Sequence, residues 1–265
     1  MASDRESDHL TDPFDRLVEQ ADQPFSGWDF SFISATGRMV GAPLPWSYAS
    51  RALAEMARAQ SLLDMDTGGG ELLAALRPLP PVAFATEGYA PNIPIARQRL
   101  EPLGVHVVKV AEGRLPFDDN RFDLVLNRHG FYDPAELFRV LRPGGRFLTQ
   151  QVGGKSYRGI PALLDAPAPG EFDHWELASA VRQVADCGLQ VLDQQEVYPA
   201  TRFYDVGALV FYLKAIPWVL PGFTVATHRE ALRRAHQQMR NKGYLEIEDH
   251  RFLIVAEKPG SDRES

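Results

Sequence analysis

The 265-residue chain has very little cysteine: Cys187 is its only one. A single cysteine excludes an internal disulfide and a zinc site built from several cysteines. Seven histidines are present, and those other than His129 show no metal-ligand spacing with cysteine or acidic residues. We therefore expect no metal site.

The chain also lacks a long uninterrupted apolar run. Its longest apolar region, residues 206–223, contains Lys214 and is broken by Pro217 and Pro221. A transmembrane helix needs about 20 consecutive apolar residues. The first residues have no apolar core of the kind that a signal peptide carries. These absences predict a cytoplasmic protein with no membrane partner.

Positive charge is scarce as well. The formal net charge is −7 and the isoelectric point is near 5.5. Because neutralising phosphates requires clustered cations, this balance argues against nucleic acid as the main partner. The length suits one large α/β domain. We expect a monomer or homodimer that acts on a small molecule.

The most informative segment of the chain is a glycine-rich turn at residues 64–71. The apolar pair Leu62 and Leu63 leads to Asp64, and the turn runs into the helix-prone segment 71–76. This pattern predicts a strand, a tight turn and a helix, which together bind a nucleotide-like ligand. Leu73 stands where the dinucleotide-binding pattern requires its third glycine, and the P-loop Lys-Ser or Lys-Thr pair is missing.

Four further segments follow in an order typical of a doubly wound α/β fold. A second apolar run, 82–86, ends at Glu87, which lies 23 residues after Asp64. An acid in this position commonly binds ribose hydroxyls. A third strand is expected at 105–110, a fourth before Asn127, and a fifth after the turn at 143–145.

Together these segments resemble class I S-adenosylmethionine (SAM)-dependent methyltransferases. The resemblance covers about residues 61–151, and the segments Trp28-Asp29-Phe30-Ser31 and Asn127-Arg128-His129 are similar to a bacterial subgroup of that family. It implies a seven-stranded, mostly parallel, Rossmann-like sheet in the order 3-2-1-4-5-7-6, with strand 7 antiparallel and helices on both faces. A different doubly wound fold with the same strand periodicity is the alternative.

The resemblance implies one domain over residues 13–258. Within it we expect an N-terminal cap at 13–60, a cofactor-binding core at 61–151 and a C-terminal substrate or lid half at 152–258. Disordered tails are expected at 1–12 and 259–265. Capping-box patterns predict helices that begin at Asp173 and at Thr227, and residues 153–170 are expected to form a loop.

The resemblance also implies a set of cofactor contacts. Two positions depart from the family pattern: Asp66 occupies the place of the first glycine, and Ala111 occupies the place of an aspartate, with Glu112 as the nearest substitute. The residues expected to bind SAM are Asp64, Asp66, Thr67, Gly68, Gly69, Gly70, Glu87, Gly88, Ala111, Glu112, Asn127 and Arg128.

The chemistry is expected where the fourth strand ends. His129 follows that strand, and its ordinary pKa suits a general base or a group that orients the acceptor. A hydrogen bond to a loop or to the cofactor is the alternative role. A hydrophobic substrate pocket is expected to use aromatic residues that equally suit core packing: Trp28, Trp46, Tyr48, Tyr204 and Trp218.

These observations predict a SAM-dependent methyltransferase with a small-molecule acceptor. An RNA methyltransferase is the alternative enzyme, against which the acidic composition argues. A SAM-binding protein without transfer activity is a third possibility, because Asp66 and Ala111 depart from the pattern. A dehydrogenase fits least well, because the third glycine is missing.

Overall fold

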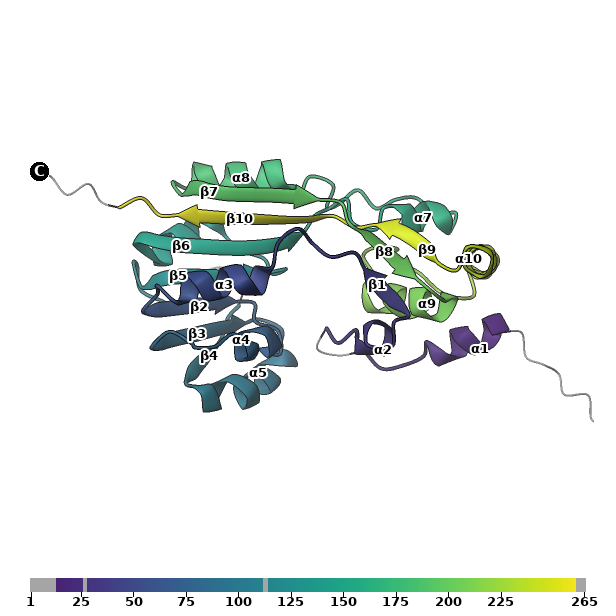
Figure 1. Cartoon of the computed structure of the whole chain (residues 1–265), viewed down its shortest axis with the longest axis horizontal. Coiled ribbons are helices and arrows are strands. Elements are labelled where there is room, and N and C mark those ends of the chain that lie inside the picture. The colour runs from purple at the N-terminus through teal and green to yellow at the C-terminus, as the bar shows by residue number, and fades with distance from the viewer. Residues whose placement is uncertain (1–12, 26–27, 112–113, 261–265) are drawn as a thin grey trace, which may run out of the picture. The chain divides into compact units, whose positions relative to one another are not determined.

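The computed structural model describes residues 13–25, 28–111 and 114–260. The chain divides into two compact units, each assembled from segments that are distant in sequence (Figure 1). Unit 1 takes residues 1–42, 157–169 and 200–248, and unit 2 takes residues 43–156, 170–199 and 249–265. The predicted segments 13–60 and 152–258 each contribute to both units.

Unit 2 contains a seven-stranded sheet in the order β4-β3-β2-β5-β6-β10-β7. β10 runs antiparallel to both β6 and β7, whereas the five strands from β4 to β6 are parallel. The predicted order and the antiparallel last strand are therefore confirmed. The strands are β2 (Ser61–Met65), β3 (Val82–Glu87), β4 (Val105–Lys109), β5 (Phe122–Arg128), β6 (Leu141–Val152), β7 (Gln190–Val197) and β10 (Arg251–Glu257).

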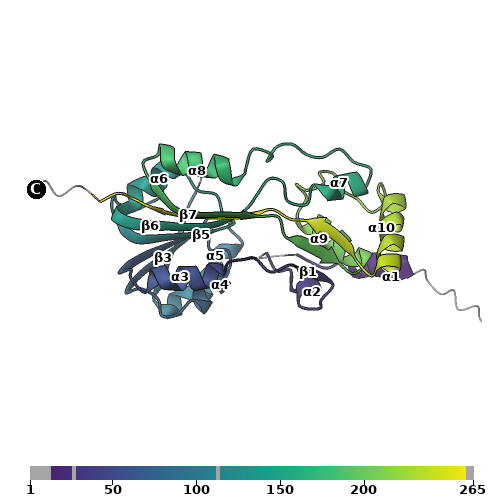
Figure 2. The same ribbon diagram turned by 45° about the horizontal axis from the view of Figure 1, so that its top comes forward.

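Helices cover both faces of this sheet, because neighbouring residues of a strand point to opposite sides. Leu62 and Leu124 pack in one core with α3, α4 and α5, and Leu63 and Val125 pack in the other with α6 and α8 (Figure 2). Burial of each such side chain stabilises the fold by about 1.5–3 kcal/mol. The helices are α3 (Tyr48–Met56), α4 (Glu71–Ala75), α5 (Asn92–Leu100), η1 (Glu101–Leu103), α6 (Pro134–Val140) and α8 (Leu177–Asp186).

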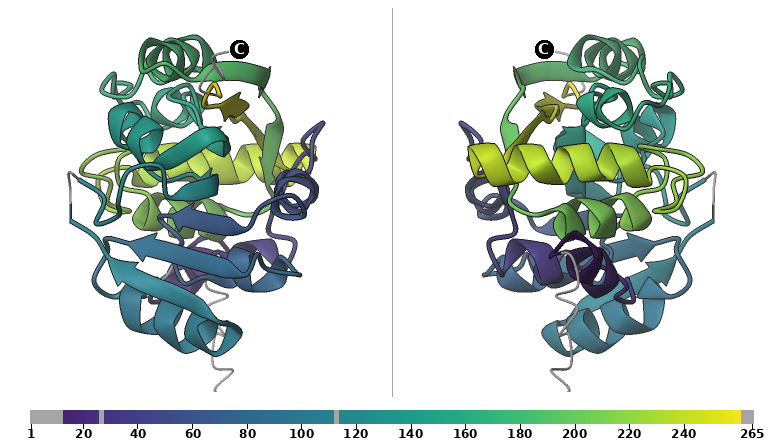
Figure 3. Two further views of the ribbon diagram at one scale, coloured as in Figure 1. Left: turned by 90° about the vertical axis from the view of Figure 1, so that its left-hand side faces the viewer. Right: turned by 90° about the vertical axis from the view of Figure 1, so that its right-hand side faces the viewer.

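Unit 1 is built around α9, in which every residue except Lys214 is buried. This helix lies within the longest apolar region of the sequence, so that region forms a core helix. It lies beside α10, the long yellow-green helix of Figure 3. A three-stranded antiparallel sheet, β1-β8-β9, completes the unit. The elements are α1 (Pro13–Gln20), α2 (Ser31–Ser34), β1 (Met39–Gly41), α7 (Gly159–Leu163), β8 (Ala200–Phe203), α9 (Val206–Ala215), α10 (Arg229–Lys242) and β9 (Leu245–Glu248).

Three local predictions were wrong. The helix expected from Asp173 begins at Leu177, because the capping box is formed by Glu176 and Ser179. The helix expected from Thr227 begins at Arg229, because the Thr227 hydroxyl bonds to Thr224 instead of capping the helix. The expected loop at 153–170 contains the short helix α7, whose Ile160 is fully buried. No helix in the described ranges is long and apolar enough to span a membrane.

One carboxylate stabilises unit 1 in two ways. Asp205 accepts a hydrogen bond from the Ala208 N–H at the start of α9, and it also forms a bidentate ion pair with Arg38 at 2.6 and 2.7 Å. Both side chains of the pair are 18% exposed. We predict that Asp205→Ala lowers the free energy of unfolding by about 2–4 kcal/mol, since the cap and a partly buried charge partner are lost.

Urea unfolding would measure this loss. The matched control is Asp22→Ala, which removes the carboxylate paired with Lys214 of the same helix. Asp22 is 86% exposed, so its removal should change stability by less than about 0.5 kcal/mol. Equal losses in the two variants would contradict the dual role of Asp205.

Candidate functional site

The glycine-rich turn joins β2 to α4 at the carboxyl edge of the unit 2 sheet. Asp66, Gly68 and Gly70 adopt positive φ angles of 54°, 65° and 79°. A Cβ atom at Gly70 would lie 2.7 Å from Leu100 of α5, whereas a Cβ atom at Gly68 would meet nothing within 4 Å. The turn is therefore closely packed at Gly70 and open at Gly68.

Asp66 keeps the backbone shape that a glycine would allow at this position. Aspartate is among the residues that enter the left-handed region most readily. The Asp66 side chain lies against Gly130, where an added Cβ atom would be 2.7 Å from Oδ2. The pKa of Asp66 is raised to about 6, mainly by burial and then by the charge of Glu87, while a hydrogen bond from the Phe131 backbone opposes the shift.

Glu87 ends β3 beside this turn, as predicted. Its side chain is 5% exposed, and its Oε1 accepts a hydrogen bond from the Tyr89 N–H at 2.7 Å. Within the described residues, no hydrogen bond is formed to Oε2. A buried carboxylate with an oxygen to spare is a suitable acceptor for a ribose hydroxyl.

Asp64 brings a third carboxylate close to Asp66 and Glu87. Burial, with a smaller contribution from the charge of Asp66, raises the pKa of Asp64 to about 7, while Thr67 and Arg128 oppose the shift. Three acidic groups at the ends of two neighbouring strands create a negative potential there. Such a site favours a ligand that carries positive charge.

A buried amide network joins the ends of the neighbouring strands. Asn127 of β5 is fully buried, and its Oδ1 accepts hydrogen bonds from Thr149 at 3.0 Å and from Gln151 at 2.6 Å. Gln151 also donates to the Gly130 carbonyl at 3.1 Å. Asn127 thus fixes the loop that follows β5, and within the described residues its side chain bonds to protein groups.

His129 follows β5 with a left-handed backbone (φ 65°), and its N–H donates to the Gln150 carbonyl. The ring is exposed, and its Nε2 lies 3.1 Å from Gln150 Nε2. The pKa of His129 is held well below its ordinary value by desolvation and by the charges of Arg128 and Arg251. Desolvation and the repulsion from both guanidinium groups act in the same direction, because each disfavours a charged ring.

Arg128 presents its guanidinium group at this edge of the sheet. Its side chain is exposed and makes no hydrogen bond or ion pair within the described ranges. Desolvation and then the charge of Arg251 lower its pKa, while Tyr48 and Asp64 oppose the shift. An unpaired guanidinium beside a ligand site is suited to a carboxylate or another anion.

The predicted substrate aromatics fall into separate groups. Trp46 and Tyr48 belong to unit 2, are 8% and 6% exposed, and donate hydrogen bonds to Gln150 and to the Asn127 carbonyl. In unit 1, Trp28 contacts Trp218 at a ring separation of 5.7 Å, whereas Tyr204 contacts Tyr244. Trp28, Trp218 and Tyr204 are 53%, 45% and 42% exposed. Their contact with substrate stays a prediction.

The remaining predicted cofactor residues lie on the loops after β2, β3 and β4. Thr67 and Gly69 belong to the glycine turn, and Gly88 directly follows Glu87. Ala111 follows β4 and is exposed, whereas Glu112 lies outside the described residues. The cofactor role of these residues stays a prediction. The described ranges contain no cluster of histidine, cysteine and acidic residues able to hold a metal.

Sequence analysis overlooked several residues at the same edge. Tyr89 and Phe131, on the loops after β3 and β5, are 61% and 82% exposed. Arg251 opens β10, and because β10 is antiparallel its first residue lies where β6 ends. His250 is also there, fully buried and bonded to Glu196 at 2.9 Å, so His129 is not the sole histidine of this edge. Arg251 and His250 could have been predicted at this edge from the expected antiparallel direction of the last strand.

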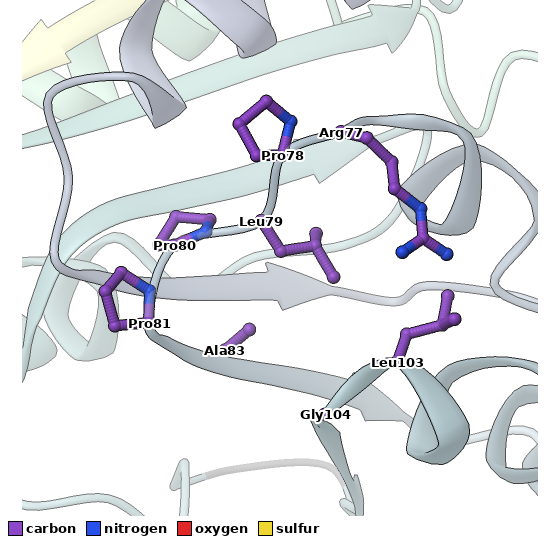
Figure 4. Close-up of a pocket in the computed structure, with 8 residues that line it drawn as sticks. All are labelled: Arg77, Pro78, Leu79, Pro80, Pro81, Ala83, Leu103 and Gly104. Atoms are coloured by element: carbon purple, nitrogen blue, oxygen red, sulfur yellow. The ribbon is translucent and has the colours of Figure 1, made fainter.

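A separate hollow of about 540 Å³ lies at the opposite edge of the sheet. Figure 4 shows the side chains of Arg77, Leu79 and Leu103 around it. Ala83 and Gly104 place it where β3 and β4 begin, at the far ends of the strands from Glu87. Ligands of open α/β sheets bind beyond the carboxyl ends, so this hollow is not the candidate site.

The doubly wound sheet and its glycine turn define unit 2 as a Rossmann-like, nucleotide-binding type of fold. Residues 63–149 match the methyltransferase domain family model. The chain is 35% identical over 120 residues to a demethylmenaquinone methyltransferase of Thermus thermophilus, covering 41% of this chain and 54% of that protein. It is 32% identical over 161 residues to a protein-L-isoaspartate O-methyltransferase of Nitrobacter winogradskyi, covering 59% and 73%.

Among solved structures, a candidate methyltransferase from Bacillus halodurans C-125 has a TM-score of 0.55 and 18% identity. The match covers 79% of this chain and 99% of that one, and it shows a common fold. The chain belongs to the class I SAM-dependent methyltransferases. It spans about half the length of the menaquinone relative.

The raised pKa of Asp64 predicts how stability depends on pH. In the unfolded chain this carboxyl titrates near 3.8, and in the folded chain near 7, so folding favours the protonated form. Its contribution to stability is present below pH 3.8 and is lost as the pH rises through 7. We predict that Asp64→Asn, which stays neutral, gains about 1–3 kcal/mol relative to the natural chain between pH 5 and 8.

Thermal unfolding of both chains across this pH range would measure the gain. The control is Asp123→Asn, because hydrogen bonds hold the pKa of Asp123 below its ordinary value despite some desolvation. The difference between that variant and the natural chain should stay constant from pH 5 to 8. A constant difference for Asp64→Asn would contradict the prediction.

Proposed function

We propose that this chain is a SAM-dependent methyltransferase that acts on a small-molecule acceptor. The observation that carries the proposal is the pairing of an open glycine turn with Glu87, whose buried carboxylate keeps Oε2 available. Methyltransferases of this domain family generally use SAM. The geometry of the turn and of the β3 carboxylate fits that ligand.

In this proposal Glu87 accepts hydrogen bonds from the ribose, and the open face of Gly68 lets the backbone approach the ligand. Arg128 receives the carboxylate of the amino-acid part, and Asp64 favours its positive charges. Bound SAM would supply an electrophilic methyl group on a sulfonium. The residues after β5 then align the acceptor and exclude water.

The proposed acceptor class rests on composition and on exposed apolar side chains. Two similar proteins are named for different acceptors: one for demethylmenaquinone and one for a protein isoaspartate. We favour a small molecule because the chain is acidic and lacks the excess of positive charge that RNA binding needs. Exposed Tyr89 and Phe131 offer apolar contact surface near the loops. A cytoplasmic location and a monomer or homodimer belong to the same proposal.

Glu87→Gln is the most direct test of the cofactor site. Gln keeps an oxygen for the Tyr89 N–H but loses the charge and one acceptor. We predict that its dissociation constant for S-adenosylhomocysteine rises about 10–100-fold, which corresponds to about 1.4–2.8 kcal/mol. Calorimetric titration would measure it. Glu101→Gln, an exposed change in η1, should bind like the natural chain. An unchanged affinity in Glu87→Gln would contradict the assignment.

Asp66→Gly tests whether the departure from the glycine pattern damages the site. The Asp66 backbone is already left-handed and its side chain lies against Gly130, so glycine should bring little change. We predict an affinity for S-adenosylhomocysteine within about threefold of the natural chain. A gain of about a hundredfold would instead favour a SAM-binding protein that has lost efficient transfer.

A further inference from the structure

Three side chains from different parts of unit 2 form a directed line of hydrogen bonds that ends at His129. The Trp46 indole Nε1 donates to Gln150 Oε1 at 2.8 Å. Gln150 Nε2 then lies 3.1 Å from His129 Nε2. Trp46 and Gln150 are 8% and 4% exposed, so water does not readily replace the bond between them.

This line of bonds determines the position of the ring proton. An indole N–H can donate but not accept, so the carbonyl oxygen of Gln150 must face Trp46. The amide NH₂ of Gln150 therefore faces His129, and His129 Nε2 must accept with its lone pair. The single proton of the neutral ring is then on Nδ1, to which no hydrogen bond is formed within the described residues.

The same contacts oppose a charged ring. An imidazolium carries a proton on both nitrogens, and its Nε2–H would point at the Gln150 NH₂. The charged groups that act on the ring are Arg128 of β5 and Arg251 of β10. Arg251 is paired with Asp249 at 2.7 Å, and Asp64 of β2 acts on Arg128. The packed residues Trp46, Tyr48 and Gln150 bring no negative charge that would stabilise a protonated ring.

We propose that Trp46 and Gln150 hold His129 as a neutral imidazole protonated on Nδ1, which offers the bound methyl acceptor a hydrogen-bond donor and takes no proton from it. The acceptor role rests on the proposed function, whereas the protonation of the ring does not. Trp46 and Gln150 are positioning residues, because they act through His129. The left-handed backbone at His129 and its N–H bond to the Gln150 carbonyl fix the ring on the same partner.

This arrangement limits the class of acceptor. The nucleophile must arrive with a lone pair already available, as in a carboxylate, a phenolate or an enolate. Its lone pair forms the new bond to the methyl carbon, while the carbon–sulfur bond breaks and its electron pair stays on sulfur. Since the acceptor brings one negative charge and the sulfonium one positive charge, both products are uncharged at the reacting atoms. No proton has to move to His129, whose Nδ1–H stabilises an oxygen of the acceptor.

The experiment is a long-range proton–nitrogen NMR correlation on the full chain, which distinguishes protonated from unprotonated ring nitrogens. His129→Asn identifies the His129 signals among the seven histidines. We expect an unprotonated Nε2 and a protonated Nδ1 in the natural chain, with a ring pKa well below its ordinary value of 6.5. A protonated Nε2 with an unprotonated Nδ1, or a ring that titrates near 6.5, would overturn the proposal.

Two variants test the cause. In Gln150→Glu the carboxylate accepts from both Trp46 and His129, so the ring proton should move to Nε2 and the pKa of His129 should rise by at least one unit. Trp46→Phe frees the Gln150 amide to turn, so both tautomers should appear. Gln194→Glu on β7 and Trp218→Phe in unit 1 are exposed controls that should leave the signals unchanged. Unchanged His129 signals in both test variants would refute the role of the hydrogen bonds from Trp46 through Gln150.

Titration of the same samples with S-adenosylhomocysteine separates this inference from the proposed function. If the ring is protonated on Nδ1 but S-adenosylhomocysteine does not bind, the hydrogen-bonded line to His129 stands and its role toward a methyl acceptor is overturned. If S-adenosylhomocysteine binds but the ring is protonated on Nε2, the cofactor site stands and the proposed effect of Trp46 and Gln150 on His129 is overturned. A bound ligand should also leave Nδ1 protonated, because the donor must remain available to the acceptor.

Discussion

The amide of Asn127 is the interaction on which the candidate site depends most. Its oxygen receives hydrogen bonds from Thr149 and Gln151, and this ties the end of β5 to the end of β6. A buried amide left without hydrogen-bond partners lowers the free energy of unfolding by about 1–3 kcal/mol, so these hydrogen bonds hold the two strand ends together. The loop at Gly130 follows their position, because Gln151 holds its carbonyl. Asp66 in turn packs against Gly130.

This dependence links side chains that look unrelated in sequence. Adjacent residues of β6 point to opposite faces, so Gln151 supports the loop after β5 while Gln150 faces Trp46 and His129. The two glutamines therefore have different tasks: one holds the backbone, and the other determines what the His129 ring presents. The chemistry of the edge thus follows from the pleat of one strand.

The sequence was sufficient for the architecture of unit 2 because its signals are local. The apolar runs ending at Asp64 and Glu87, with the glycine turn between, locate the first strands, and the resemblance to the methyltransferase family supplied the strand order. The fold of unit 1 was harder to predict from the sequence. Its strands β1 and β8 are short, lie about 160 residues apart and pair through backbone atoms. The start of α8 was misplaced because Asp173 and Glu176 both suit a capping box, and the reciprocal hydrogen bonds form between Glu176 and Ser179.

The site was predictable to the extent that it lies on strand ends. The positions of Glu87 and His129 follow directly from the predicted strand ends. The hydrogen bond from Trp46 to Gln150 joins residues 104 positions apart, and no sequence spacing predicts it. Arg251 and His250 were overlooked because an antiparallel strand delivers its first residues, not its last, to this edge. The substrate role of the aromatics in unit 1 has no comparable geometric support.

The left-handed backbone at Asp66 has a consequence for how such chains are recognised. A glycine motif records a set of dihedral angles more than a set of side chains, and aspartate or asparagine can meet the same angle. Patterns that demand glycine at this position therefore pass over members whose loop has the same path. A profile written in terms of the sign of φ would group Asp66 with the glycines it replaces, and would treat this chain as an ordinary variant of the motif.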